Sequence, residues 1–362
     1  MDALDHVLKI EEKLVTKATL ANIPLGGTFE LLPLCNMNCD MCFIRLDKNE
    51  MNKIGQLKSA DEWLKVAQQM RNAGTLFVLL TGGEPFLYPE FIKLYEGLRK
   101  LGMIIAINTN GTMVTEEIAS VLGKDKPRRV NITLYGASNE TYNKLCHNPK
   151  GFDQTIKGIE LLLKHKIDIK LNGSIVPENV NEIDKLQNIA NKYGLYMKMD
   201  TYMYPTSRER LKPFRQDARL NHKDAAKASV HIKKIQESEE SFNSYKDYML
   251  SNCNSAQPLT ECGVNCRAGK SAFWITWYGD MTPCIFLKKP GINVFENSFD
   301  ECWKYIVKET KKVHLPKACM SCKKRDVCQV CAASTYCETG NYDEAPEYMC
   351  HYIDEILNEL RG

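Results

Sequence analysis

The sequence predicts an α/β fold in which a parallel sheet with outer helices is followed by a smaller unit rich in cysteine. Strand-like and helix-like segments alternate six times between residues 27 and 204, and most of the 15 cysteines lie in two groups, around residue 40 and after residue 252. Repeated strand–helix units favour a parallel sheet, either a partial barrel or a doubly wound sheet. With 362 residues, of which 44% are hydrophobic, the chain is long enough to bury the cores of two units.

The six expected strands are short runs of apolar and β-branched residues at 28–32, 76–80, 104–108, 130–134, 167–175 and 196–203. Between them, apolar residues recur with a helical period, most clearly at 59–70, 88–101 and 155–165. The first of these helices has its own start signal, because Ser59 is a good N-cap and Asp61 and Glu62 favour the first turn. Side chains that do chemistry on such sheets gather at the carboxyl ends of the strands.

The composition divides the chain into four expected segments. Residues 1–27 are a helical lead-in that covers the barrel or its opening, residues 28–205 hold the strand–helix units, residues 206–252 are a charged helical bridge, and residues 253–362 form a cysteine-rich domain. In the last segment we expect little regular structure apart from one hairpin. That hairpin is "AFWITWYGDMTPCIF" at 272–286, whose two β-prone runs meet around Tyr278, Gly279 and Asp280.

The overall charge and hydropathy restrict the possible partners. A net charge of +3 and a pI near 8.1 are too weak a bias to indicate a nucleic acid or a membrane. The start, "MDALDHVLKIEEKL", is acidic and unlike a signal peptide, and runs such as "LFVLL" are too short to cross a bilayer. We therefore expect a cytoplasmic protein. In that reducing compartment, tight groups of cysteines bind metal more often than they form disulfides.

Three cysteines follow the first expected strand in the spacing C-x3-C-x2-C: Cys35, Cys39 and Cys42. Four thiolates would saturate a four-iron cluster, so three leave one iron open for a small molecule. The alternative is part of a zinc site whose fourth ligand lies elsewhere in the chain.

The second expected strand is followed by Gly82, Gly83, Glu84 and Pro85. Two glycines allow the backbone to approach a ligand closely, and the glutamate adds an acceptor for an ammonium group. Taken alone, this segment favours an ordinary strand-to-helix turn. Beside the three cysteines, it predicts a clamp for an amino group.

In this order, the cysteine loop and the Gly-Gly-Glu-Pro segment resemble the radical S-adenosylmethionine (SAM) superfamily over residues 28–204. The resemblance implies a partial (β/α)6 TIM-like barrel followed by a small cysteine-rich iron–sulfur domain. It also implies that SAM chelates the open iron and is reductively cleaved to a 5′-deoxyadenosyl radical, which takes hydrogen from a substrate. Met41 occupies a position that is often aromatic in the family.

Further SAM contacts are expected at the ends of later strands, where relatives bind the ribose and the carboxylate. The resemblance points to Asn108, Asn110, Thr133 and Asn172, with Ser174 as an additional candidate. Capping of strand ends is an alternative role for each of them. Relatives often carry an arginine after the fourth strand, whereas this chain offers only Lys144 there.

The C-terminal cysteines resemble the SPASM extension of radical SAM enzymes, which holds two auxiliary four-iron clusters. The resemblance assigns one cluster to Cys262, Cys266, Cys284 and Cys331, and the other to Cys319, Cys322, Cys328 and Cys350. A pair of zinc ribbons is the alternative. Cys337 is a possible substitute ligand, and a non-ligating Cys262 would leave the first of these clusters open.

A few residues outside these motifs are also singled out. Cys253 and Cys302 are expected to be buried as small hydrophobic residues, and Cys146 is a candidate hydrogen-atom donor. Candidate substrate contacts lie after the fourth and sixth strands. They are Tyr135, Tyr202, Tyr204 and Arg208.

The resemblance favours maturation of a ribosomally made peptide or protein, by crosslinking or oxidation, as the function. The alternatives are oxidation or rearrangement of a small metabolite such as a sugar or alcohol and, more distantly, a zinc-stabilised module without catalytic activity. A flavodoxin or ferredoxin-type donor is expected to meet the basic run Lys323–Lys324–Arg325. A separate peptide-recognition protein is a further expected partner.

Overall fold

The computed structural model describes residues 3–205, 218–259, 264 and 266–362. Its centre is a nine-stranded sheet in the order β6-β5-β4-β3-β2-β1-β7-β8-β9, in which β1 to β6 run parallel. The six parallel strands confirm the six that were predicted. They are β1 (Gly26–Glu30), β2 (Phe77–Thr81), β3 (Ile104–Thr109), β4 (Arg129–Thr133), β5 (Ile169–Ser174) and β6 (Met197–Asp200).

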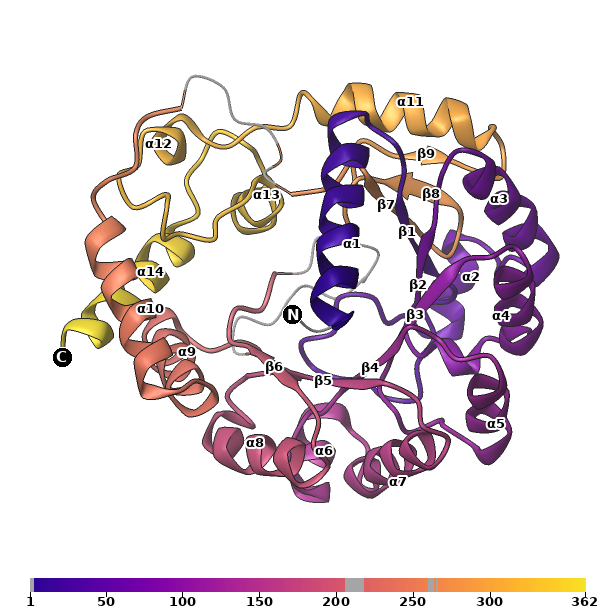
Figure 1. Cartoon of the computed structure of the whole chain (residues 1–362), viewed down its shortest axis with the longest axis horizontal. Helices are drawn as coiled ribbons and strands as arrows, with labels where there is room; N and C mark the ends of the chain where they lie inside the picture. The colour runs from indigo at the N-terminus through magenta and orange to yellow at the C-terminus, as the bar shows by residue number, and fades with distance from the viewer. Residues whose placement is uncertain (1–2, 206–217, 260–263, 265) are drawn as a thin grey trace.

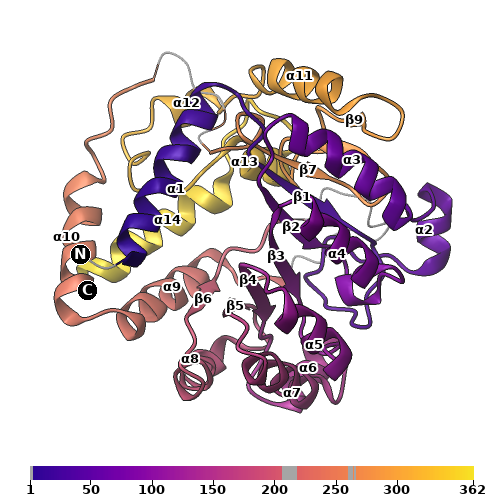
Figure 2. The same ribbon diagram turned by 45° about the vertical axis from the view of Figure 1, so that its right-hand side comes forward.

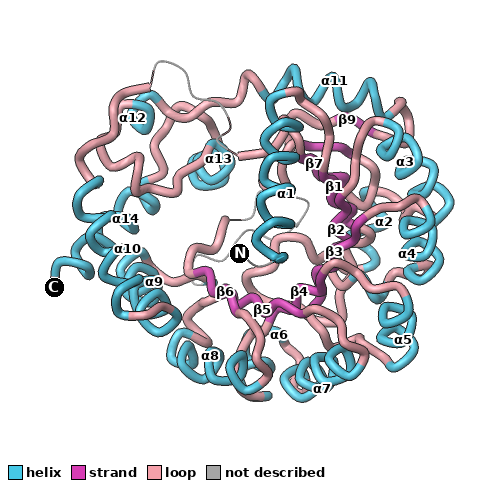
Figure 3. The backbone as a smooth tube through the Cα atoms, in the orientation of Figure 1, coloured by secondary structure: helices cyan, strands magenta, loops and turns pink. Residues whose placement is uncertain are grey.

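The helices between the strands all lie on the outer, convex side of this curved sheet (Figures 1 and 3). This arrangement is a partial barrel and excludes a doubly wound sheet, which has helices on both faces. Buried residues alternate along β3 and β5, and the apolar ones pack against the helices. The helices are α2 (Lys48–Ile54), α3 (Ala60–Asn72), α4 (Phe91–Lys100), α5 (Glu116–Lys124), α6 (Asn139–Cys146), α7 (Gly151–Lys164) and α8 (Ile183–Lys192).

The helix predicted at 59–70 begins as expected. Ser59 accepts a hydrogen bond from the backbone of Glu62, and the Glu62 carboxylate accepts one from the Ser59 N–H, which completes a capping box. Trp63 on this helix is fully buried against Phe29 of β1, with ring centroids 4.5 Å apart. The local start signal and the buried face therefore agree.

The predicted hairpin forms, but it belongs to the barrel sheet. Its strands are β7 (Ala272–Ile275) and β8 (Asp280–Thr282), which pair antiparallel, and β9 (Ile292–Asn293) adds to β8. β7 also pairs parallel with β1, so the hairpin extends the sheet at its first strand. The start of the cysteine-rich segment thus supports the barrel.

The expectation of little other regular structure after residue 252 was wrong. The structure has α11 (Phe299–Thr310), the short helices α12 (Lys317–Met320) and α13 (Ala332–Thr339), and α14 (Glu347–Arg361). Buried residues at helical spacing on α14, such as Ile353, Ile356 and Leu360, pack against the helical bridge. The abundance of cysteine and lysine in this segment hid that amphipathic pattern.

The helical bridge is confirmed as α9 (His222–Gln236) and α10 (Glu239–Asn252). α9 packs against α14 and α8, beyond β6. Figures 1 and 2 show these helices beside the open end of the sheet, with the cysteine-rich segment between them and β7.

The N-terminal helix α1 (Ala3–Leu20) covers the end of the barrel at which the strands begin (Figure 1). Glu11 forms an ion pair of 2.6 Å with Arg128, directly before β4, and Thr19 bonds to Ser271, directly before β7. α1 therefore lies opposite the carboxyl ends of the strands. In the described part of the chain, no helix combines the length and apolar character needed to span a membrane.

Candidate functional site

The three-cysteine loop, which contains Cys35, Cys39 and Cys42, leaves the carboxyl end of β1 and is held by the last turn of α6. The backbone N–H groups of Asn38 and Asp40 donate to the carbonyls of Cys146 and Leu145, at 3.0 and 3.1 Å. Free carbonyls at the end of a helix are natural partners for a neighbouring loop. A strand and a helix end therefore both fix the position of the thiols.

The Gly-Gly-Glu-Pro segment lies directly beside this loop. Gly83 N–H donates to the carbonyl of Leu32 at 2.7 Å, and Glu84 N–H donates to that of Leu34 at 3.0 Å. A Cβ atom on Gly83 would lie 2.2 Å from the Leu34 carbonyl oxygen, and one on Gly82 would lie 2.5 Å from that of Leu32. The glycines are therefore needed for the close packing of the two motifs.

The side chain of Glu84 is fully buried and its oxygens are occupied. It accepts hydrogen bonds from the Thr109 hydroxyl at 2.7 and 2.9 Å, from Asn110 N–H at 2.8 Å and from Phe86 N–H at 3.1 Å. Burial raises the pKa of this carboxyl to about 7, although these hydrogen bonds oppose the rise. The carboxylate thus joins the loop after β2 to the end of β3, and only the backbone of the segment is left to meet a ligand.

The two motifs face one cavity of about 570 Å3 at the carboxyl ends of the strands, here called the SAM cavity. Besides Met41, the predicted site residues that line it are Cys35, Cys39, Cys42, Gly82, Gly83, Asn108, Asn110, Thr133, Tyr135, Ser174, Tyr202 and Tyr204. Glu84, Pro85 and Asn172 are not among its lining residues. Asn172 pairs with Thr133 in the sheet register and lies two residues before Ser174 on β5. Lys144 forms an ion pair of 2.7 Å with Glu140 on α6.

The thiols of the loop receive hydrogen bonds of the kind that iron-bound sulfur accepts. Met37 N–H and the Asn110 amide donate to Cys35 Sγ at 3.4 and 3.6 Å, and Arg45 N–H donates to Cys42 Sγ at 3.4 Å. Burial, together with the nearby Glu84 and the other two thiols, raises the pKa of Cys35 to about 12. A bound metal is what normally deprotonates such a buried thiol. The donors present therefore fit an iron–sulfur cluster with three protein ligands.

Cys146 is fully buried on the last turn of α6. Its thiol is in hydrogen-bonding contact with that of Cys39, a contact that raises the pKa of Cys39, and it does not line the SAM cavity. Its role as a hydrogen-atom donor stays a prediction. Cys253 and Cys302 are buried as expected, with 6% and 0% exposure.

The four cysteines assigned to one auxiliary cluster, here called the outer group, are Cys319, Cys322, Cys328 and Cys350. They surround a single pocket of about 50 Å3. Burial and, next, repulsion from the three other thiols raise the pKa of Cys319 to about 11. Lys324 and Arg325 line the same pocket. Lys324 pairs with Asp354, and Arg325 donates to backbone carbonyls, so only Lys323 in this basic run is exposed.

Cys262, Cys266, Cys284 and Cys331, assigned to the other auxiliary cluster, are here called the inner group. The three of them that the structure describes, Cys266, Cys284 and Cys331, lie near one another. Burial raises the pKa of Cys284 to about 12, and Cys331, Cys266 and Cys337 add to the rise by repulsion. Cys262 lies outside the described residues, as does Arg208. Within the described part of the chain, no three His, Cys, Asp or Glu side chains meet closely enough to hold one metal ion, so both ligand sets stay predictions.

Aromatic side chains form a wall between the three-cysteine loop and the inner group. Tyr204 stacks on Phe286 with ring centroids 3.8 Å apart, and Phe43 also packs against Phe286, with ring centroids 5.0 Å apart. The sequence analysis missed both phenylalanines, although each lies one or two positions after a predicted ligand, Cys42 or Cys284.

A buried ion pair holds this wall to the cysteine-rich segment. Arg219, before α9, forms a bond of 2.7 Å with Glu338 on α13, and both side chains are 8% exposed. Tyr202 donates its hydroxyl hydrogen to the same carboxylate at 2.6 Å. No local pattern indicates this pair, because its partners are far apart in the sequence.

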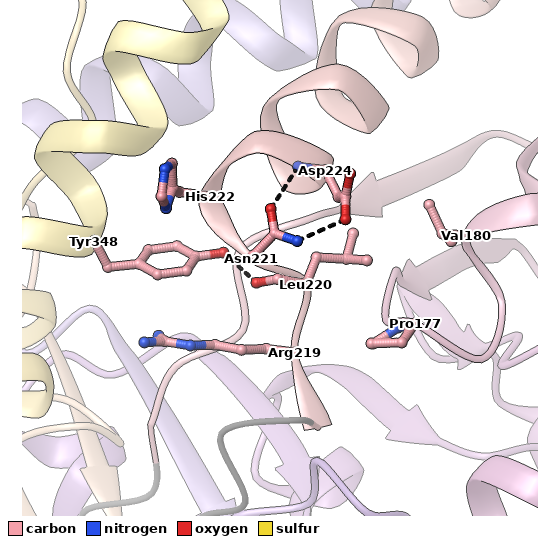
Figure 4. Close-up of a pocket in the computed structure, with 8 residues that line it drawn as sticks. All are labelled: Pro177, Val180, Arg219, Leu220, Asn221, His222, Asp224 and Tyr348. Atoms are coloured by element: carbon pink, nitrogen blue, oxygen red, sulfur yellow. Dashed lines mark hydrogen bonds between the residues drawn. The ribbon is translucent and has the colours of Figure 1, made fainter.

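A larger open pocket of about 720 Å3 lies beside the start of α9 (Figure 4). Its polar groups are engaged locally: Asn221 caps α9, Tyr348 donates to the Leu220 carbonyl at 2.7 Å, and the Arg219 guanidinium lies 4.0 Å from the Tyr348 ring centroid. No cysteine lines it. The smaller SAM cavity is therefore the better candidate site.

Comparison with known proteins supports this site. Residues 29–190 match the Radical SAM superfamily. The chain is 25% identical to the AdoMet-dependent heme synthase of Methanosarcina barkeri, over 92% of this chain and 98% of that protein. It is 24% identical to the subtilosin biosynthesis protein AlbA of Bacillus subtilis, over 87% of this chain and 66% of AlbA.

A solved structure has the same fold. Streptococcus suis SuiB was solved with S-adenosylmethionine and with the precursor peptide SuiA. The match to the S-adenosylmethionine complex covers 96% of this chain and 80% of SuiB, with a TM-score of 0.64 and 19% identity. The match to the SuiA complex covers 97% of this chain and 82% of SuiB, with a TM-score of 0.68 and 18% identity. The family match, residues 29–190, spans the three-cysteine loop, the Gly-Gly-Glu-Pro segment and strands β2 to β5. Residues 29–190 therefore form a radical SAM domain of an enzyme, and a cysteine-rich part follows this domain.

Proposed function

We propose that this enzyme matures a ribosomally made peptide or protein by radical chemistry. One observation carries the proposal: the three-cysteine loop, the Gly-Gly segment and the tyrosine-bearing aromatic wall all face one cavity, and Cys284 and Cys331 of the inner group lie close to Tyr204 of that wall. This arrangement suits hydrogen abstraction on one side and electron removal on the other.

The residues of the SAM cavity have separable roles in this proposal. Cys35, Cys39 and Cys42 would hold a four-iron cluster, and its open iron would bind SAM. When bound, this pair supplies the 5′-deoxyadenosyl radical that abstracts hydrogen from the substrate. The backbone of Gly82 and Gly83 would bind the amino group.

The polar strand ends complete the SAM site. Asn108, Asn110, Thr133 and Asn172 are proposed to bind the ribose and the carboxylate of SAM. Asn110 already bonds to Cys35 Sγ and to Asn36, and thereby connects the strand end with the three-cysteine loop.

The outer and inner groups are proposed to hold two auxiliary four-iron clusters that conduct electrons. The outer group is nearer to the exposed Lys323, where a flavodoxin or ferredoxin-type donor would bind. Full ligation by four thiolates suits electron transfer, because no iron is left open.

A peptide substrate is supported by two of the similar proteins. AlbA is named for biosynthesis of the bacteriocin subtilosin, and SuiB was solved with its precursor peptide. A cavity with both apolar and polar walls suits a peptide side chain. A separate peptide-recognition protein remains part of the proposal.

Modification of a small metabolite is the second candidate. It is favoured by the similarity to AdoMet-dependent heme synthase, which covers 98% of that protein. A substrate of this class would be a tetrapyrrole rather than the sugar or alcohol expected from the sequence.

Iron and sulfide analysis after anaerobic reconstitution tests the cofactor assignment. We expect about 12 irons per chain in the wild type and about 8 in the triple variant Cys35/Cys39/Cys42→Ala. About four and none would remove the auxiliary clusters from the proposal. Mass spectrometry of reactions with peptides from neighbouring genes, or with an iron tetrapyrrole, then separates the two substrate classes.

A further inference from the structure

A second cavity, of about 400 Å3, lies along the open edge of β6 and is called the edge cavity here. β6 is the last strand of the sheet, so only its β5 side is paired (Figure 3). Four consecutive residues, from Lys198 to Thr201, line this cavity. Because successive side chains of a strand point to opposite faces, a cavity bounded by four in a row runs along the edge of the strand.

The backbone of β6 directs hydrogen-bonding groups toward the edge cavity. N–H groups of β5 and of the residue after it donate to the carbonyls of Tyr196 and Asp200, at 2.9 Å each. In a parallel ladder, alternate residues bond to the same neighbour. Met197 and Met199 therefore direct their N–H and C=O groups away from β5.

The outward carbonyl of Met197 already accepts a hydrogen bond from an amide. Gln236 of α9 donates its side-chain amide to the Met197 carbonyl at 2.9 Å. Met199, the next outward residue, is 8% exposed, and neither its N–H nor its C=O has a hydrogen-bond partner among the residues that the structure describes. Buried backbone groups nearly always have a hydrogen-bond partner. The N–H and C=O of Met199 therefore mark a position where a ligand or water supplies the partner.

The edge cavity adjoins the SAM cavity. Five residues line both: Lys198, Asp200, Tyr202, Tyr204 and Gln329. The remaining walls of the edge cavity come from α9, α10, α14 and the segment 327–329. A chain that lies along β6 therefore continues toward the three-cysteine loop.

We propose that an extended segment of the substrate peptide adds to the edge of β6 as a further strand. Its backbone bonds to Met199, and the residue to be modified enters the SAM cavity. This inference rests on the proposed maturation of peptides. From Met197 to Thr201 the edge spans about 13 Å, which is room for about four substrate residues. Main-chain bonds supply affinity for many sequences, and alternate side chains meet the cavity walls.

Peptide selection with a matched pair of variants tests the proposal. The probe is a random-sequence library of dodecapeptides, selected on the reconstituted, SAM-loaded wild-type enzyme. Met199→Pro removes the outward N–H and leaves the β5 ladder intact, because proline is tolerated where the N–H faces away from the sheet. Met199→Leu keeps the N–H and nearly the same volume. We expect selected peptides to bind Met199→Leu within about twofold of wild type and Met199→Pro at least about tenfold more weakly.

A second measurement uses only the wild-type enzyme, so it does not depend on how well the proline variant folds. Each selected peptide is resynthesised with a single N-methyl group at successive backbone positions. Strand addition predicts that, within the stretch of about four residues that lies along the edge, affinity falls about tenfold at alternate positions and hardly changes at the others. Equal binding to both variants, a scan without alternation, or no enriched peptide would overturn the proposal and leave the cavity to water or a small metabolite.

The same peptides separate this inference from the proposed function. If a selected peptide is covalently modified but its N-methyl scan lacks alternation, peptide maturation stands and strand addition fails. If binding alternates but no peptide is modified under turnover conditions, strand addition stands and the maturation proposal fails.

Discussion

The three-cysteine loop and the outer cysteine group differ in the space that they leave. The loop faces a cavity of about 570 Å3 that glycines and polar strand ends also line. The outer group of four cysteines surrounds about 50 Å3. One thiol fewer and a much larger cavity suit binding of a second molecule beside a cluster. Four thiols and a small pocket suit a cluster alone.

The two regions also differ in how the fold holds them. The carboxyl end of β1, the loop after β2 and the last turn of α6 all donate or accept hydrogen bonds at the three-cysteine loop. The outer group is built from the short helix α12, the turns after it and the start of α14. The barrel sheet therefore positions the three-cysteine loop, whereas the position of the outer group depends on the packing of short segments.

Among the predicted changes, loss of a cysteine from the three-cysteine loop should have the largest effect on SAM cleavage. In Cys39→Ala, SAM cleavage should fall at least about a hundredfold, because the cluster loses one of only three ligands, and iron should fall from about 12 to about 8 per chain. Formation of 5′-deoxyadenosine measures the cleavage. Cys302→Ala, in the buried face of α11, is the matched control and should retain both iron and cleavage. Wild-type cleavage by Cys39→Ala would refute the assignment.

Loss of an outer cysteine should separate two activities instead of abolishing both. In Cys322→Ala, 5′-deoxyadenosine should still form, while product formation should stop because electrons no longer pass through the outer cluster. Parallel assays of 5′-deoxyadenosine and modified substrate measure this uncoupling. Product made at the full rate would show that the outer group is dispensable, and the contrast between the regions would lose its functional meaning.

The buried ion pair between Arg219, before α9, and Glu338, on α13, provides a test of stability. Arg219→Leu leaves the Glu338 carboxylate, 8% exposed, without its cation, so we expect a loss of about 3–5 kcal/mol. Thermal unfolding of the loaded enzyme measures the change. The double variant Arg219→Leu/Glu338→Leu should recover part of the loss, because it leaves no unpaired buried charge. A single variant as stable as wild type would mean that solvent reaches Glu338.

The smallest expected effect is the pH dependence conferred by Glu84. Its pKa is raised by burial from 4.5 to about 7, so between these values the folded state binds more protons than the unfolded state. The contribution of Glu84 to stability should therefore be greatest below about pH 4.5, fall by roughly 3 kcal/mol as the pH rises to about 7, and then level off. Unfolding midpoints from pH 5 to 8 measure the slope. Glu84→Gln should have a flatter profile, and an equal slope in both proteins would assign the effect to another group.

Much of the barrel could be predicted from local patterns. All six parallel strands and the capped helix at Ser59 form where apolar periodicity and start signals indicated. The hairpin was also predicted, but its pairing with β1 was not, because strand partners separated by more than 200 residues leave no local signal. The helices after residue 298 were not predicted, although α11 and α14 carry buried apolar residues at helical spacing.

The candidate site was predicted to a similar extent. Most of the residues predicted at strand ends do line the SAM cavity, because the carboxyl ends of parallel strands meet at one edge of the sheet. It overestimated Glu84, whose carboxylate bonds to Thr109 and Asn110 and does not line the cavity. Sequence spacing cannot indicate whether a polar side chain after a strand points into the cavity or caps a neighbour.

By itself, the sequence indicated the resemblance to radical SAM enzymes, the three-cysteine loop and the alternation of strands and helices, because spacing and periodicity are properties of neighbouring residues. Only the tertiary structure decided which groups meet: the glycines that pack on the backbone of Leu32 and Leu34, the aromatic wall between the loop and Cys284, and the ion pair of Arg219 with Glu338. The same holds for the open edge of β6. These contacts join segments that are distant in the chain, and their geometry follows from packing of the whole fold.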